Sequence, residues 1–299
     1  MKRRKLVQKL KEMGLTIWEG VPLARYTTIR TGGTAEIMVF PERVEELVKT
    51  WHFLRTEGIP YFILSGGSKV LFPDEGFSGV VVNLRRLKGL KELAPGRLEA
   101  LSGTPTSALI AYGLTKGFSG AEFLAGIPAT VGGALYMNAG AFGRCFSELV
   151  EELEILTEEG LARLAAGPEL WRYRAFQGPR GVFVRAVVRL KPALKEEVRS
   201  RVKAALSRRR QTQPFGPPSF GCVFKNPEEA PAGYLIEKAG LKGLARGGAV
   251  ISEKHANFIL NLGKACTNDI LYLVEEARER VFRTFGLELQ PEVRIVGQA

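Results

Sequence analysis

The sequence predicts alternating α/β layering in a protein of two or three domains, and three observations indicate this. Buried-type strands alternate with amphipathic helices through the first eighty residues, a pattern typical of layered helices and strands. The chain has 299 residues, more than one small core needs, because domains usually hold roughly 100 to 150 residues. Its hydrophobic content of 45% is that of an ordinary soluble globular protein.

The first eighty residues are expected to form two helices and three strands. Leu6, Leu10 and Met13 share one face of a short amphipathic helix. A second helix should open at Pro41 and end at Gly58, because an apolar stripe at helical spacing lies between them. Strands are expected at Ala35–Phe40, Tyr61–Leu64 and Gly79–Asn83.

The remainder of the chain is expected to be mixed, with a further structural unit beginning near Pro192. Before that point the pattern indicates a helix, glycine-rich turns and two strands, at Thr106–Lys116, Gly126–Gly143, Leu149–Leu156 and Gly181–Leu190. After it come three helices, at Lys195–Arg210, Ala232–Ala239 and from Thr267 to Gly286, with strands at Gly248–Ile251, Asn257–Leu262 and Glu288–Val296. A proline-rich linker, Gln211–Pro218, follows the first of these helices.

The chain is strongly basic, with 43 lysines and arginines against 31 acidic residues and a formal net charge of +12. This favours an anionic partner, which could be nucleic acid, a membrane surface or a phosphate-bearing small molecule, and charge alone does not choose among them. The densest cluster, Arg208–Arg210, ends a predicted helix, where basic residues also suit the helix dipole as a solvated end.

No apolar run approaches the roughly 20 residues of a membrane span, and the first ten residues lack the apolar stretch of a secretory signal. We therefore expect a cytoplasmic protein without membrane insertion. The cysteines Cys145, Cys222 and Cys266 are far apart and form no C-x-x-C pair, so neither a disulfide framework nor a metal site is expected. With only His52 and His255 present, a histidine-dependent metal site or hydrolytic triad is not expected.

The segment Ser219–Pro227 places one ionisable thiol, Cys222, between a glycine and a short tail that carries Lys225 and Asn226. A thiol with a free pKa of roughly 8.5 can act as an acid or, once deprotonated, as a nucleophile. The alternative interpretation is a small packing residue beside a turn, because isolated cysteines usually fill cores.

Two glycine clusters are candidates for ligand binding. Ser65–Lys69 follows a predicted buried strand, and consecutive glycines there can present backbone N–H groups to phosphate oxygens, although a tight β-turn explains the pattern as well. It lacks both the G-x-G-x-x-G and the G-K-[ST] patterns of familiar nucleotide loops. Ala125–Ala141 combines small residues with few polar side chains, as expected where backbone approaches a large flat ligand, or where a loop lies between packed layers.

Taken together in chain order, these motifs resemble the family of UDP-N-acetylenolpyruvoylglucosamine reductases. The resemblance covers nearly the whole chain, and its shorter subtype, without a tyrosine lid, is indicated by the few residues between Pro227 and Gly233. The motifs that carry it are Thr27–Gly33, Ser65–Ser68, Gly126–Gly140, Tyr173–Arg174, Gly221–Pro227 and Pro291–Glu292.

The resemblance implies an α+β fold, with a two-lobed FAD-binding domain of the vanillyl-alcohol-oxidase type and a smaller α/β substrate-binding domain. The implied boundaries are 1–83 and 84–192 for the two lobes, 193–283 for the substrate domain, and 284–299 for a strand that returns towards the active site. The implied reaction uses NADPH to reduce FAD, which then reduces UDP-N-acetylglucosamine enolpyruvate to UDP-N-acetylmuramate for peptidoglycan synthesis. The implied partner is thus a small-molecule UDP-sugar, without nucleic acid, and the protein is expected to be a monomer.

By the same resemblance, Arg174 and Glu292 would polarise the enolpyruvyl carboxylate and Cys222 would protonate the substrate carbon. Lys225, Asn226 and His255 would contact the UDP-sugar. The implied FAD contacts are Thr28, Ile29, Arg30, Ser65, Gly66, Gly67, Ser68, Lys69, Gly126, Ile127, Pro128, Thr130, Val131, Gly132, Gly133, Asn138 and Ala139.

Two residues depart from the family pattern. The family usually has serine where this chain has Cys222; a thiol is the more acidic group and is open to oxidation. The first glycine loop usually ends in serine-asparagine, whereas here Lys69 follows Ser68, which puts one flavin contact in question.

Two alternatives remain open at the level of sequence. One is another flavin-dependent oxidoreductase of the same superfamily, although members that attach flavin through histidine would need a histidine in a flavin-loop motif. The other is a basic nucleic-acid-binding protein, although no recognised binding module accompanies the charge.

Overall fold

The computed structural model describes residues 3–297. They form two compact units, each assembled from segments that are separate in the sequence. Unit 1 comprises the chain up to Glu19 together with Ile37–Gly66 and Gly79–Arg208, and unit 2 comprises Gly20–Glu36, Gly67–Ser78 and the chain from Arg209. These units differ from the expected boundaries at 83, 192 and 283, because two short segments from the first eighty residues belong with the C-terminal third.

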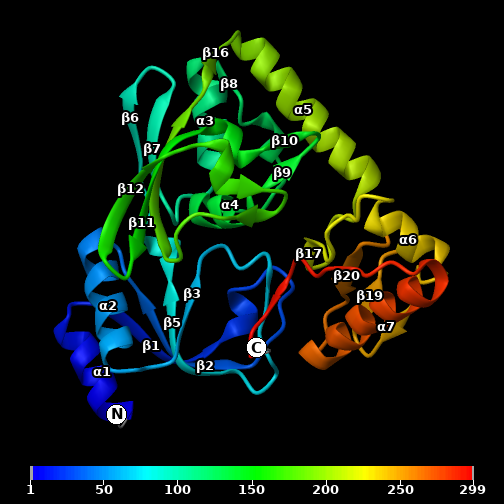
Figure 1. The fold of residues 1–299 in the computed structure, drawn as a ribbon, viewed down its shortest axis with the longest axis horizontal. Coiled ribbons are helices and arrows are strands. Elements are labelled where there is room, and N and C mark those ends of the chain that lie inside the picture. Colours follow the sequence, from blue (N-terminus) through cyan, green and yellow to red (C-terminus); the bar gives the residue numbers. More distant parts are fainter. Residues whose placement is uncertain (1–2, 298–299) are drawn as a thin grey trace. The chain divides into compact units, whose positions relative to one another are not determined.

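Unit 1 contains an antiparallel five-stranded sheet in the order β12-β11-β15-β7-β6 (Figure 1). The central strand β15 (Val182–Arg189) pairs with β11 (Val150–Thr157) on one side and with β7 (Arg97–Leu101) on the other. The outer strands are β12 (Gly160–Ala165) and β6 (Leu90–Ala94). Helix α4 (Val131–Met137) packs on this sheet and shares its apolar core, while α3 (Ser107–Lys116) adds Leu109 to that core.

A second apolar core in unit 1 lies beneath helices α1 (Arg3–Glu12) and α2 (Val44–Thr56). Leu6 and Leu10 of α1 and Leu47 of α2 are buried there, as the helical spacing predicts. Leu156 and Val184 of the five-stranded sheet join the same core, so the two expected lobes share one apolar cluster.

The four-stranded sheet β1-β2-β5-β3 supplies the other side of that core. Its strands are β1 (Thr16–Pro22), β2 (Thr34–Phe40), β5 (Phe77–Asn83) and β3 (Tyr61–Leu64). β3 and β5 are parallel, with Tyr61 opposite Val80 and Leu64 opposite Asn83. The chain leaves β3 directly into the Ser65 loop, as predicted.

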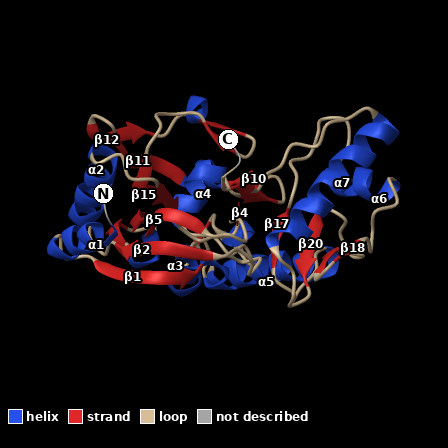
Figure 2. Cartoon of the chain, turned by 90° about the horizontal axis from the view of Figure 1, so that it is seen from below, coloured by secondary structure: helices blue, strands red, loops and turns tan. Residues whose placement is uncertain are grey.

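Unit 2 contains the four-stranded sheet β17-β20-β19-β18 and two helices (Figure 2). The strands are β17 (Ser219–Cys222), β20 (Phe258–Asn261), β19 (Ala249–Ile251) and β18 (Ala245–Arg246). Helix α7 (Thr267–Phe285) packs against β18 and β19 and also against α6 (Ala232–Lys238). Gly286 ends α7 in the left-handed conformation, as predicted.

Three features of the fold differ from expectation. The segment from Glu288 forms only a two-residue strand, β21 (Arg294–Ile295), which pairs in parallel with β4 (Val70–Leu71). The glycine-rich stretch predicted as turns contains the helix α4. The long helix α5 (Lys195–Thr212) forms as expected, but its basic end is not simply solvated, because Arg209 is buried and Arg208 lies 4.8 Å from the ring centre of Phe142.

Candidate functional site

In unit 1 the first residues of the Ser65 loop meet the start of α4. The hydroxyls of Ser65 and Thr130 are hydrogen-bonded across 65 residues of sequence. Thr130 also caps α4 by accepting a hydrogen bond from the Gly133 amide at 3.4 Å. Arg85 fixes the loop from the other side, donating to the Gly66 carbonyl at 2.9 Å. The start of the first glycine cluster thus adjoins the second cluster within unit 1.

Gly132 of α4 is required for close packing. A Cβ atom on Gly132 would lie 2.8 Å from the Cβ of Ser102, closer than real side chains approach. Asn138 ends the helix with a φ of 40°, and its side chain accepts from the Ser147 amide at 3.1 Å and donates to the Arg172 carbonyl at 3.3 Å. Ala139 follows it and packs against the core of the five-stranded sheet. The second cluster is therefore a tightly packed helix with the Thr130 hydroxyl at its start and the Asn138 amide at its end.

Arg174 lies in the two-residue turn of a small hairpin between β13 (Trp171–Arg172) and β14 (Ala175–Phe176). Its φ of 56° is unusual for a residue with a side chain. The guanidinium donates to the carbonyls of Gly140 at 2.9 Å and Asn138 at 3.4 Å, so the hairpin turn is held to the loop that follows α4. The predicted catalytic arginine is thus anchored to one of the predicted flavin loops.

The second half of the Ser65 loop belongs to unit 2, where it packs on the Thr27–Gly33 segment. Gly67 accepts a hydrogen bond from the Thr28 amide at 3.0 Å, and the Thr28 hydroxyl donates to the Ser219 carbonyl at 2.7 Å. Asn261 donates to the Ile29 carbonyl at 2.9 Å. The residues predicted at positions 28–30 therefore adjoin the strand that ends at Cys222.

Cys222, Glu292 and Lys69 are brought together in unit 2. Cys222 is half-buried at the end of β17, and the residue after it accepts a hydrogen bond from the Glu292 amide at 2.7 Å. The Lys69 ammonium lies 3.5 Å from the Glu292 carboxylate and donates to the Cys222 carbonyl. The structure therefore groups the predicted proton donor with the predicted carboxylate, whereas Arg174 belongs to unit 1.

Asn257 organises this cluster and was missed in the sequence. Its side-chain oxygen accepts from the amides of Val223 and Phe224 at 3.2 and 2.9 Å, and its side-chain nitrogen donates to the Phe224 carbonyl at 2.9 Å. The side chain is buried. A polar residue between Ala256 and Phe258, at the start of an apolar strand, was the available signal, because a buried amide must find partners.

The three residues predicted to contact the UDP-sugar also lie in unit 2. The Lys225 amide donates to the Gln290 carbonyl at 2.9 Å, and the Asn226 side chain accepts from the Ala232 amide at 3.1 Å, where α6 begins. His255 accepts from the Asn257 amide at 3.3 Å through Nδ1. Burial lowers the pKa of His255 below its usual value of 6.5, and the Lys242 ammonium lowers it further.

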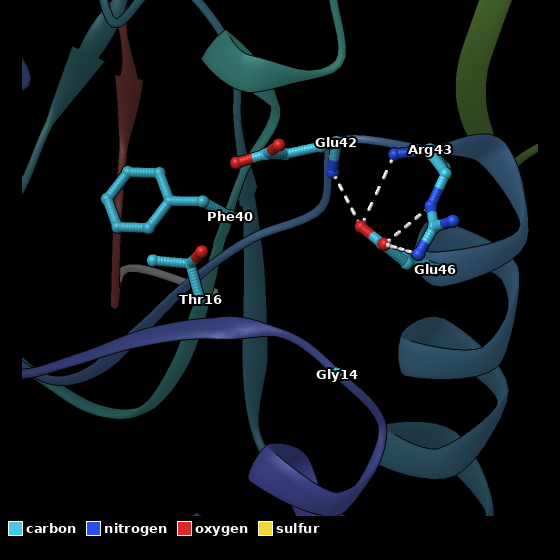
Figure 3. A pocket seen from close by; sticks show the side chains of 6 residues that line it. All are labelled: Gly14, Thr16, Phe40, Glu42, Arg43 and Glu46. Carbon is cyan, nitrogen blue, oxygen red and sulfur yellow. Dashed lines mark hydrogen bonds and ion pairs between the residues drawn. The ribbon is translucent and has the colours of Figure 1, made fainter.

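A pocket in unit 1 has no predicted site residue in its lining (Figure 3). Gly14, Thr16, Phe40, Glu42, Arg43 and Glu46 line it. Glu46 pairs with Arg43 at 2.8 Å and accepts from the Glu42 amide at 2.8 Å, so it caps the start of α2. This arrangement accounts for the charged groups of the pocket as parts of a helix end.

A second pocket, in unit 2, is lined by Arg30 together with residues 216–218 and 261–263. It adjoins the predicted flavin-contact segment. Within residues 3–297, no group of three or more histidine, cysteine, aspartate or glutamate side chains is placed to hold a metal ion. The helices in that same range include none with the length and apolarity of a membrane span.

Comparison with known proteins assigns a class to this arrangement. Residues 35–164 match the family model described as an FAD binding domain. They include β3, the whole Ser65 loop and all of α4, so the paired glycine clusters fall within a flavin-binding module.

Residues 213–296 match the model described as the C-terminal domain of UDP-N-acetylenolpyruvoylglucosamine reductase. Reductases of that name from Synechococcus sp. (strain JA-3-3Ab) and Alkalilimnicola ehrlichii are 43% and 45% identical, over 94% of this chain and 91% and 94% of their own. The crystal structure of UDP-N-acetylenolpyruvylglucosamine reductase from Thermus caldophilus superposes with a TM-score of 0.77 at 35% identity, covering 94% of this chain and 98% of that one. The chain belongs to the UDP-N-acetylenolpyruvoylglucosamine reductase family.

Proposed function

We propose that this protein reduces UDP-N-acetylglucosamine enolpyruvate to UDP-N-acetylmuramate, a step of peptidoglycan precursor synthesis, with NADPH as reductant and FAD as cofactor. The observation that carries the proposal is the 43–45% identity over nearly the full chain to reductases of that name. The grouping of Cys222 with Glu292 in unit 2 supports it, because the reaction needs an acid beside a polar carboxylate-binding site.

The residues of the two glycine clusters suit a dinucleotide cofactor. Ser65 and Thr130 supply hydroxyls, and the glycines around them leave backbone close to the surface of any bound group. We assign FAD binding to these clusters and to residues 28–30, with Gly126, Ile127, Pro128, Val131 and Gly133 completing the set. When bound, FAD supplies hydride transfer from NADPH to the substrate.

The protein side chains have three roles in this proposal. The Arg174 guanidinium binds the enolpyruvyl carboxylate and stabilises the negative charge that develops on it. The Cys222 thiol donates the proton that the substrate carbon gains, while Glu292 orients the enolpyruvyl carboxylate. Lys225, Asn226 and His255 contact the UDP-sugar. The net reaction adds one hydride and one proton across the carbon–carbon double bond and oxidises NADPH to NADP⁺.

We extend the proposal to the biological setting. All three ligands carry phosphates, which accounts for a net charge of +12 without a nucleic-acid partner. We infer a cytoplasmic monomer whose loss would affect cell shape and division through the supply of cell-wall precursor. Cell fractionation and size-exclusion chromatography with light scattering test these two assignments.

Anaerobic stopped-flow spectroscopy tests the proposed reaction. The purified protein should be yellow, NADPH should bleach it, and UDP-N-acetylglucosamine enolpyruvate should restore the oxidised spectrum with formation of UDP-N-acetylmuramate. A reduced flavin that this substrate does not reoxidise would contradict the proposal.

A further inference from the structure

Three short segments lie side by side in unit 2, and backbone hydrogen bonds fix them to one another. Lys69 accepts from the Arg294 amide at 2.9 Å at the start of the parallel pairing between β4 and β21. Glu292 donates to Val223 at 2.7 Å, and Phe224 forms an antiparallel bridge with Pro291. The backbones that carry residues 69, 222 and 292 are therefore held in register.

The Lys69 side chain connects the other two. Its ammonium lies 3.5 Å from a Glu292 carboxylate oxygen and also donates to the Cys222 carbonyl. The side chains of Lys69 and Glu292 are only 22% and 6% exposed, in contrast to a surface pair such as Arg283 and Glu279 at 75% and 59%. This is one of the more enclosed ion pairs of the described chain.

The low exposure of Lys69 and Glu292 makes their electrostatic interactions stronger than those of a surface ion pair. A buried carboxylate loses its hydration, and an adjacent ammonium compensates for that loss. The proposed substrate brings a further carboxylate to Glu292, and two like charges repel strongly where solvent screening is weak. A fixed positive charge beside Glu292 offsets this repulsion.

We propose that Lys69 is a positioning residue for the reaction at Glu292. Its ammonium keeps the Glu292 carboxylate oriented and compensates its charge, while its bond to the Cys222 carbonyl holds the thiol-bearing strand end against that carboxylate. This inference rests on the proposed function. Lys69 and Cys222 are the two departures from the family pattern, and both adjoin Glu292.

Half-reaction kinetics of Lys69→Met test the proposal. Methionine keeps most of the apolar stem but removes the charge, so reoxidation of the reduced flavin by the enolpyruvyl substrate should slow by about 10²-fold, as for a misplaced catalytic group. Lys69 lies in a cluster assigned to FAD binding, so both half-reactions are measured per bound flavin. The rate of reoxidation should fall at least about tenfold more than the rate of reduction by NADPH, because only reoxidation involves Glu292. Lys69→Arg, which keeps the charge, should recover at least about tenfold of the lost rate. The matched control is Lys238→Met, the same change on an exposed helix position of unit 2, which should alter neither half-reaction.

A double variant separates positioning from a general structural role. If Lys69 acts through Glu292, adding Lys69→Met to Glu292→Gln should slow reoxidation by less than about threefold, because the carboxylate charge that Lys69 compensates is already absent. The thermal unfolding midpoint gives a second readout that does not depend on turnover. It should fall in Lys69→Met and return to near the Glu292→Gln value in the double variant.

The possible results distinguish the role of Lys69 from the proposed function. Wild-type reoxidation by Lys69→Met, or the same loss in the Glu292→Gln background as in the wild-type background, would overturn the role of Lys69 while leaving the proposed function intact. A wild-type flavin that the enolpyruvyl substrate fails to reoxidise would instead overturn the proposed function, and the inference with it. If Lys69→Met does not fold, Lys69→Arg and the double variant still report the effect of charge.

Discussion

At the scale of single residues, the Cys222 thiol separates the two half-reactions of the proposed enzyme. Cys222→Ala should leave flavin reduction by NADPH nearly intact, because that step needs no proton from the thiol. Reoxidation by the enolpyruvyl substrate should slow by roughly 10²- to 10⁴-fold, the usual contribution of a positioned acid. Rapid-mixing absorbance measurements of each half-reaction give both rates.

Cys222→Ser is the matched control, since it keeps a small hydroxyl donor at the same position. It should restore much of the reoxidation rate while removing sensitivity to thiol oxidation. Equal losses in both half-reactions of Cys222→Ala would refute proton donation by this residue.

His255 gives unit 2 a pH dependence of stability. Burial holds its folded-state pKa below the usual 6.5, so the unfolded chain binds the proton more readily in the window from 6.5 down to the folded value. The free energy of unfolding should therefore fall as pH decreases through that window, with a slope of at most about 1.4 kcal/mol per pH unit for one proton. Urea unfolding between pH 5 and 8 measures it, and His255→Gln should remove this part of the slope. An identical slope in wild type and variant would contradict the assignment.

At the scale of elements, the Ser65 loop depends on glycine at position 67. Gly67 has a φ of 70°, and an added Cβ would lie 2.0 Å from the Tyr26 carbonyl oxygen. Gly67→Ala should therefore combine backbone strain of about 1 kcal/mol with a steric clash, for a total loss of about 3 kcal/mol or more. Denaturant unfolding and flavin content report the effect.

Gly240→Ala is the matched control, because Gly240 has nearly the same φ of 73° but open space around it. It should cost only the strain of about 1 kcal/mol. Equal losses for the two variants would show that the close approach to Tyr26 is unimportant.

Helical periodicity predicted the described α-helices except α4, and strand patterns predicted β2, β3, β5, β11, β15, β19 and β20. The strands β1, β6, β7, β12 and β17 were not predicted. Two of the failures have local causes. The apolar stripe from Val44 to Leu54 predicted helix α2, since every third or fourth residue faces one core. Helix α4 was missed because Gly132 and Gly133 are poor helix formers, whereas here glycine is needed for contact with Ser102. The expected strand after Glu288 is mostly irregular. Single hydrogen bonds, such as that from Glu292 to Val223, fix the segment, and a continuous strand ladder does not form.

At the scale of the whole molecule, the chain is divided in a way that local patterns do not show. Residues 20–36 and 67–78 belong with the C-terminal third because Ile29 and Leu71 are buried in its core. The grouping of these segments depends on contacts between residues about two hundred positions apart. Hydrophobic periodicity reports only local structure and does not predict such contacts. The resemblance of the motifs nevertheless predicted the family, because their order along the chain carries information that single elements lack.

The central claim concerns three residues that are scattered along the chain. The proposal assigns Arg174, Cys222 and Glu292 to one substrate. A crystal structure of the protein with FAD and the enolpyruvyl substrate measures this directly. We expect the Arg174 guanidinium and Glu292 carboxylate at the enolpyruvyl carboxylate, with the Cys222 sulfur next to the carbon that gains the proton. A substrate bound with its double bond remote from the Cys222 sulfur would contradict the account.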